Sequence, residues 1–239
     1  DLCRKIRSYE GVAGKYLIRS IFIGGGTPSI LDAGQIRDIF DAIRGTFPLD
    51  SDAEISIEVN PGTVDRMKMI SYQRAGINRL SIGLQSVNDQ ELKMLGRIHT
   101  FEDFLETYTI AREEGFHNIN VDLMSGIPFQ TLTEWEKTLK TVAELRPEHI
   151  SAYSLIIEKG TPFYEKYGEG ERAEARRKRE LPDEDTERLM YQFTKNILAD
   201  YGYHRYEISN YAKEGYECRH NLGYWDRIEY LGIGTGAAS

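Results

Sequence analysis

The feature that most constrains the fold is a regular alternation of short apolar runs with amphipathic stretches. Apolar and β-branched residues concentrate in five runs, at residues 20–23, 54–59, 79–84, 119–124 and 149–157. Between these runs apolar residues recur at helical spacing, as they do at Ile36, Ile39, Phe40 and Ile43. Strands that alternate with helices predict β–α–β units and a parallel sheet. We therefore expect an α/β fold.

Glycines or polar residues stand at the carboxyl end of each predicted strand. They are Gly24, Gly25, Gly26, Glu58, Gln85, Asp122 and Tyr153. They recur at intervals of about 30 residues, the length of one β–α–β unit. The carboxyl ends of parallel strands form the functional rim of a barrel or an open sheet. The spacing therefore predicts a binding site at that rim.

The character of the sequence changes after about residue 160. Residues 166–187 are dense in charge and poor in core residues, which favours a solvated connection. Residues 189–201 return to helical periodicity, and Gly202 is a plausible C-cap. No clear period follows from residue 203 onward. We expect one domain over residues 1–160 and a smaller region over residues 161–239.

Charge and cysteine content narrow the classes of function. The chain has 38 acidic and 30 basic side chains and a formal charge of -8, which argues against nucleic acid as a partner. No apolar run approaches the roughly 18 residues of a membrane-spanning helix. Cys3 and Cys218 are the two cysteines, too few for a disulfide framework. We expect a cytoplasmic protein without an integral membrane segment.

Each rim residue has a functional and a purely structural interpretation. The loop Gly24-Gly25-Gly26-Thr27 lets backbone approach a ligand, yet it would also make a tight turn, and it lacks the lysine of a phosphate-binding P-loop. Glu58 could hold a ribose hydroxyl or an ammonium group, or pair with an arginine.

The same two interpretations apply further along the chain. Arg97 could bind a carboxylate through its planar fork. Asp122 lies within an apolar strand, where an acid is costly unless it is paired or used. His99 is expected to be a surface residue where a helix begins.

The most unusual segment is Cys218-Arg219-His220-Asn221-Leu222-Gly223-Tyr224-Trp225. Cysteine, histidine and tyrosine can all be axial haem ligands, and aromatic side chains can flank a porphyrin. No second pair of ligands exists elsewhere, which disfavours a structural zinc site. A histidine in a loop is more often a hydrogen-bonding group than a ligand, so both interpretations of His220 stay open from the residues alone.

Several strings occur together in one order: FIGGGTPS, EISIEVNPGT, INRLSIGLQS, LGRIHT, NVDLMSGIP, HISAYSL and CRHNLGYW. Over essentially the whole chain, this set resembles the radical S-adenosylmethionine (SAM) family of oxygen-independent coproporphyrinogen III oxidases and their HemW-type haem-chaperone relatives. The resemblance implies that SAM is bound by Gly25, Gly26, Thr27, Glu58, Gln85, Arg97 and Asp122. It also implies a partial (β/α)6 TIM-like barrel, followed by a small, incomplete α+β region that begins the C-terminal part of the HemW type.

The motif H-N-x-x-Y-W, from His220 to Trp225, resembles the haem chaperones rather than the oxidases. The resemblance implies haem or porphyrin as the bound molecule, with His220, Tyr224 and Trp225 as its contacts and apo-haemoproteins as recipients. The alternative is an oxygen-independent coproporphyrinogen III oxidase in porphyrin biosynthesis. Whether the protein is an enzyme stays open at this point.

One family motif is missing. The family binds a [4Fe–4S] cluster through C-x-x-x-C-x-x-C, and this sequence has no such motif. We expect the cluster ligands to lie outside this chain, which is expected to begin after the cluster loop and its strand. Ala238 also stands where the family often has histidine.

Overall fold

The computed structural model describes residues 1–237, so Ala238 lies outside the described residues. The chain forms two compact units. Unit 1 contains residues 1–83, residues 103–120 and the chain from Glu217 onward, and unit 2 contains residues 84–102 and 121–216. The boundaries between the units fall at residues 83/84, 102/103, 120/121 and 216/217.

Unit 1 carries the first strand–helix repeats. Its elements are α1 (Leu2–Arg7), α2 (Glu10–Ala13), β1 (Ile18–Ile23), the 3-10 turn η1 (Pro28–Ile30), α3 (Ala33–Thr46), β2 (Leu49–Val59), α4 (Arg66–Arg74), most of β3 (Arg79–Gln85), most of α6 (Phe101–Glu113) and α11 (Arg219–Trp225). The predicted strands at residues 20–23, 54–59 and 79–84 are confirmed.

The strands of unit 1 pair in parallel, as the alternation with helices predicts. β1 pairs with β2 and β2 pairs with β3, with Ser20 opposite Glu54 and Ser56 opposite Arg79. Side chains two residues apart point to the same face of a strand. Ser20, Glu54, Ser56 and Arg79 therefore share one face of this sheet.

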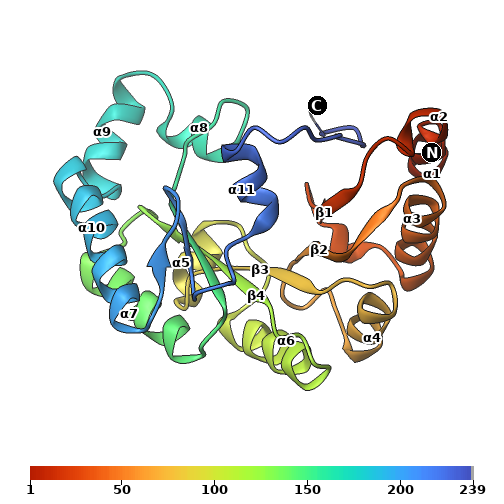
Figure 1. The fold of residues 1–239 in the computed structure, drawn as a ribbon. Coiled ribbons are helices and arrows are strands. Elements are labelled where there is room, and N and C mark those ends of the chain that lie inside the picture. Colours follow the sequence, from red (N-terminus) through yellow and green to blue (C-terminus); the bar gives the residue numbers. More distant parts are fainter. Residues whose placement is uncertain (238–239) are drawn as a thin grey trace. The chain divides into compact units, whose positions relative to one another are not determined.

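A helical layer closes one end of unit 1. Ile6 of α1, Ala13 of α2 and Ile39 of α3 belong to one buried apolar cluster that also includes Phe47. Figure 1 shows α1, α2 and α3 side by side (red to orange) next to β1 and β2. α3 begins at a capping box in which Asp32 and Gln35 bond each other's backbone N–H, which fixes the turn after the glycine loop.

Unit 2 contains the later repeats and the C-terminal strands. Its elements are α5 (Asp89–Met94), most of β4 (Ile119–Ser125), α7 (Leu132–Glu144), β5 (His149–Ser154), α8 (Pro162–Tyr167), α9 (Glu171–Glu180), α10 (Glu184–Asp200), β6 (His204–Arg205) and β7 (Asn210–Ala212). β7 is antiparallel to both β5 and β6.

The structure adds detail where the sequence showed no pattern. Residues 166–187 are largely exposed, as expected for a solvated stretch, but they form the helix α9 and the ends of α8 and α10. The region after residue 203 contains β6, β7 and α11. The boundary expected at residue 160 stays a prediction.

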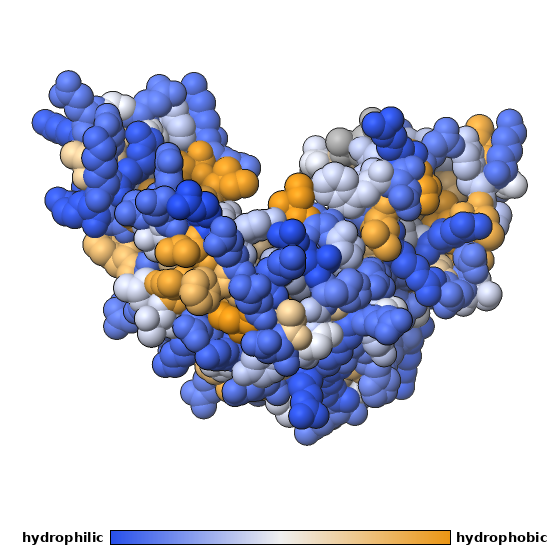
Figure 2. All heavy atoms as spheres, turned by 60° about the vertical axis from the view of Figure 1, so that its left-hand side comes forward, coloured by the Kyte–Doolittle hydropathy of each residue, from blue (hydrophilic) through white to orange (hydrophobic). Residues whose placement is uncertain are grey.

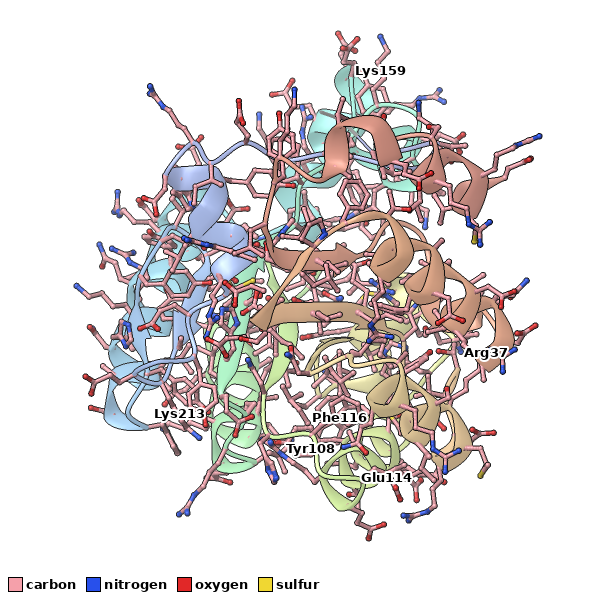
Figure 3. All side chains as sticks on the ribbon, turned by 45° about the vertical axis from the view of Figure 1, so that its right-hand side comes forward. Arg37, Tyr108, Glu114, Phe116, Lys159 and Lys213 are labelled. Atoms are coloured by element: carbon pink, nitrogen blue, oxygen red, sulfur yellow. The ribbon has the colours of Figure 1, made fainter. Side chains whose placement is uncertain are left out.

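The face drawn in Figure 2 is largely hydrophilic, with hydrophobic residues in several small groups. At the end of α6, the Arg112 guanidinium donates to the Tyr108 hydroxyl and to the Phe116 carbonyl, and Figure 3 shows Tyr108 and Phe116 close together there. In the part of the chain that the structure describes, no helix is long and apolar enough to cross a membrane.

A buried side-chain hydrogen bond joins α7 to α10 and gives a test of the fold. The Trp135 indole N–H donates to Thr194 Oγ1 at 2.9 Å. We predict that Thr194→Val lowers the free energy of unfolding by about 1–3 kcal/mol, because the buried indole N–H loses its acceptor. The cost should shrink in a Trp135→Phe background, measured by urea denaturation.

Thr138 supplies the matched control. It lies on the same helix as Trp135, is 1% exposed, and its Oγ1 has no hydrogen-bond partner among the described residues. Thr138→Val should therefore leave the free energy of unfolding unchanged or raise it. An equal loss in both variants would contradict the assigned role of the hydrogen bond.

Candidate functional site

The segment singled out in the sequence forms α11, which packs against β1 in unit 1. Ser20 Oγ lies 3.1 Å from His220 Nδ1. The Phe22 ring stacks on the imidazole with 5.3 Å between centroids and 24° between planes. The Tyr224 ring contacts the imidazole edge-on, with 5.0 Å between ring centroids. The histidine thus contacts two side chains of β1 and one aromatic side chain of its own helix.

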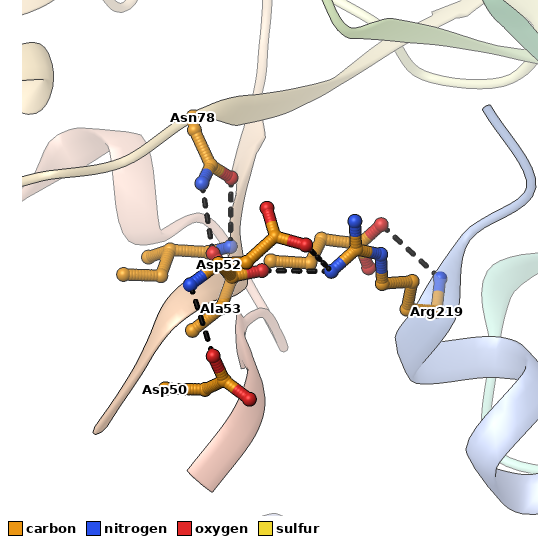
Figure 4. A network of polar contacts seen from close by, with 7 residues as sticks. Asp50, Asp52, Ala53, Asn78 and Arg219 are labelled. Atoms are coloured by element: carbon orange, nitrogen blue, oxygen red, sulfur yellow. Dashed lines mark hydrogen bonds and ion pairs between the residues drawn. The ribbon is translucent and has the colours of Figure 1, made fainter. Parts of the chain in front are cut away.

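A buried carboxylate holds the start of this helix. Glu54 of β2 is 6% exposed, and its Oε1 accepts hydrogen bonds from the His220 backbone N–H at 3.1 Å and from Cys218 Sγ at 3.4 Å. Its Oε2 accepts from the Arg219 backbone N–H at 3.1 Å. The Arg219 guanidinium also pairs with the Asp52 carboxylate at 2.9 Å (Figure 4). Residues 218–220 are therefore tied to β2.

Burial sets the protonation states around α11. Burial lowers the pKa of the His220 imidazole; the Glu54 carboxylate acts in the opposite direction and the buried Arg79 guanidinium adds to the lowering. A lowered pKa favours the neutral ring, the form that ligates metals. Burial also raises the pKa of the Cys218 thiol to about 11. Cys218 is therefore a neutral hydrogen-bond donor rather than a thiolate.

Aromatic side chains continue along the exposed part of the segment. Tyr224 contacts Tyr230 edge-on at 4.7 Å between ring centroids. Tyr224 is 49% and Trp225 is 57% exposed. Large exposed aromatic rings beside a half-buried histidine provide an apolar surface that a flat hydrophobic molecule can cover.

The glycine loop lies at the carboxyl end of β1, as predicted. The Gly25 N–H donates to Glu58 Oε2 at 3.0 Å, and Thr27 Oγ1 accepts from the Asn60 amide at 3.1 Å. Gly25 and Gly26 have φ angles of 82° and 69°, and no atom lies within 4 Å of a Cβ built on either. The loop therefore leaves open space beside the Glu58 carboxylate, which suits a ligand with an ammonium group.

The remaining predicted rim residues belong to unit 2. Gln85 ends β3 with a φ of 77° and is 3% exposed, and its Oε1 accepts a hydrogen bond from the Tyr153 hydroxyl at 2.9 Å. Arg97 follows α5 and Asp122 lies in β4, and both are partly buried. Gln85 and Tyr153 are thus brought together, while the SAM-binding role of the whole set stays a prediction.

Two buried polar residues correct or extend the sequence analysis. The expectation of a surface position for His99 is wrong, because it is 7% exposed and its Nε2 bonds the Leu84 carbonyl at 3.2 Å. Glu91 was not singled out, yet it is 2% exposed and accepts hydrogen bonds on Oε2 from Ser86 (2.6 Å) and Gln130 (2.9 Å). Its position in a charged stretch of sequence gave no signal of burial.

Comparisons with known proteins agree with this arrangement. A model of the radical SAM superfamily matches residues 5–142. The heme chaperone HemW of Escherichia coli is 43% identical over 92% of this chain and 55% of its own length. HemW of Bacillus subtilis is 40% identical over 92% of this chain and 56% of its own length. The chain belongs to the radical SAM superfamily, and it spans about half the length of these curated relatives.

A solved structure shows the same fold. Coproporphyrinogen III oxidase (HemN) from Escherichia coli, a radical SAM enzyme, matches with a TM-score of 0.76 and 28% identity over 95% of this chain and 50% of that chain. The predicted fold class, an α/β fold with a partial (β/α)6 TIM-like barrel of the radical SAM type, is confirmed.

The superfamily's cofactors are SAM and a [4Fe–4S] cluster. The described residues fit SAM but not the cluster. The open glycine loop beside Glu58 fits the amino-acid end of SAM. The cluster does not fit: Cys3 and Cys218 are the two cysteines, Cys218 is buried, and no group of three histidine, cysteine or acidic side chains within residues 1–237 could hold a metal. Residues 1–237 therefore do not supply a set of ligands for the cluster.

The buried Glu91 predicts a pH-dependent stability. Burial raises its pKa, and the hydrogen bonds from Ser86 and Gln130 oppose that effect. A raised pKa in the folded state means that Glu91 favours folding below its ordinary pKa of about 4.3, and that this contribution is lost as the pH rises through the folded value. Glu91→Gln should therefore gain stability relative to the unmodified chain as the pH increases. A difference in urea midpoint that does not change with pH would contradict this.

The glycine loop predicts a steric effect at Gly24. A Cβ at this position would lie 2.8 Å from Glu58 Oε1 and 2.8 Å from Phe22 Cε1. We expect Gly24→Ala to cost about 1–3 kcal/mol of unfolding free energy, because one or both side chains must move. Gly45→Ala in α3 is the control, since no atom lies within 4 Å of its Cβ position. Equal stability of the two variants in denaturant titrations would refute the close approach.

Proposed function

We propose that the intact protein is a haem chaperone, which binds haem and transfers it to apo-haemoproteins. The observation that carries the proposal is His220: a histidine whose ring is fixed by Ser20, Phe22 and Tyr224, and whose Nε2 has no hydrogen-bond partner among the described residues. A neutral imidazole with one available nitrogen is a common haem-iron ligand. Tyr224 and Trp225 supply the aromatic surface for the porphyrin.

The relatives support this proposal. Two curated proteins with 43% and 40% identity are heme chaperones. The alternative, an oxygen-independent coproporphyrinogen III oxidase, is supported by the HemN structure at the lower identity of 28%. We place the protein in the cytoplasm, where haem recipients would be met during their maturation.

The rim residues are assigned to SAM within this proposal. Gly25, Gly26 and Thr27 would approach the amino-acid end with backbone, and Glu58 would accept hydrogen bonds from its ammonium group. The proposed contacts to the rest of the molecule are Gln85, Arg97 and Asp122. When bound with the cluster of the intact protein, SAM supplies radical chemistry; the chain's own residues bind and orient it.

The proposal is tested by an anaerobic haem titration of the intact protein. We expect saturable one-to-one binding with a Soret band, and at least a tenfold weaker affinity in His220→Ala, equivalent to about 1.4 kcal/mol. His117→Ala is the matched control, because His117 is exposed and lies outside α11. An unchanged haem affinity in His220→Ala would contradict the assignment of His220 as the haem ligand. Turnover of coproporphyrinogen III by the intact protein would favour the oxidase.

A further inference from the structure

Two polar residues of the sheet in unit 1 form hydrogen bonds with His220, the proposed haem contact. Ser20 of β1 and Glu54 of β2 are directly opposite each other in the parallel register. Both bond His220, Ser20 through the ring and Glu54 through the backbone. Each is the first residue of an apolar run in the sequence and lies about 165 to 200 residues from His220, a separation that periodicity and spacing do not reveal.

Glu54 fixes where the histidine lies. A carboxylate that is 6% exposed is expensive unless its oxygens accept hydrogen bonds. Both oxygens are satisfied by donors from Cys218, Arg219 and His220. The buried carboxylate is therefore stabilised only when the turn that carries His220 adopts the conformation that presents these donors.

Ser20 is the hydrogen-bond partner of one of the two ring nitrogens of His220. A neutral imidazole carries its proton on one nitrogen only, and the hydrogen bond made by one nitrogen decides which nitrogen is left with a lone pair. His220 Nδ1 faces Ser20 Oγ, and Ser20 is directly opposite Glu54 in the register of β1 and β2. The Glu54 carboxylate favours a proton on the ring, and the buried Arg79 guanidinium on the same face opposes it with the smaller effect of the two. The stacked Phe22 ring opposes rotation of the imidazole that would exchange the two nitrogens.

We propose that Ser20 and Glu54 are positioning residues for His220: Glu54 fixes its backbone, and Ser20 accepts the proton of Nδ1, so that Nε2 is left to bind haem iron. This inference rests on the proposed function. Histidine ligands commonly donate their second ring N–H to a protein oxygen, and loss of that partner typically weakens metal binding 10- to 100-fold.

The first test needs no haem. Nitrogen-15 NMR of the full chain, with labelled histidine and at a pH where His220 is neutral, reports which ring nitrogen carries the proton. We expect the Nδ1–H form in the unmodified chain and in Ser20→Thr, which keeps the hydroxyl. In Ser20→Ala the population should shift towards Nε2–H. Ser51→Ala, on exposed β2 surface, is the control and should leave the tautomer unchanged.

The second test measures haem affinity of the same variants in the intact protein. Ser20→Ala should bind haem about 10- to 100-fold more weakly, with recovery in Ser20→Thr. Glu54→Gln, which keeps the shape but replaces one acceptor oxygen with a donor, should also bind more weakly. An unchanged tautomer or an unchanged affinity in Ser20→Ala overturns the inference, and so does failure of Ser20→Thr to recover.

Different results would contradict the haem site at His220 and the positioning role of Ser20 and Glu54. If His220→Ala binds haem as tightly as the unmodified protein, the proposed haem site is wrong and the inference falls with it. If His220→Ala loses binding while Ser20→Ala keeps both tautomer and affinity, the haem site stands and only the positioning role is wrong.

Discussion

The buried Glu54 carboxylate is the interaction on which the candidate site depends. It lies in the middle of a parallel strand, where a charge is stable only if it is fully hydrogen-bonded. Its three donors come from the turn that begins α11, which the sequence places more than 160 residues later. The Glu54 carboxylate therefore connects the sheet of unit 1, through hydrogen bonds, to the segment that carries His220, Tyr224 and Trp225.

The same face of β1 and β2 links the two proposed ligand sites. Glu54 and Glu58 both point to it, four residues apart along β2, or about 13 Å at the usual strand rise. Phe22 lies between them on β1, since it stacks on His220 and would also contact a Cβ at Gly24. The glycine loop and the rim carboxylate thus belong to the same pair of strands that the histidine packs against.

Much of the fold could be predicted from periodicity, because parallel strands are continuous apolar runs and their polar ends recur with each β–α–β unit. The strands ending near Gly24, Glu58 and Gln85 are where the sequence places them. The burial of His99 and Glu91 could not be predicted, because a polar residue in a polar stretch gives no sign of its tertiary partners. The roles of Ser20 and Glu54 could not be predicted either, because each only begins an apolar run and their partner on α11 is distant in sequence.

Resonance Raman spectroscopy of the ferrous haem complex of the intact protein shows whether His220 Nε2 binds the haem iron, as we propose. We expect an iron–histidine stretching band in the unmodified protein that shifts when histidine is labelled with nitrogen-15 and is absent from the residual complex of His220→Ala. An iron–histidine band that persists unchanged in His220→Ala, or its absence from the unmodified protein, would contradict the claim.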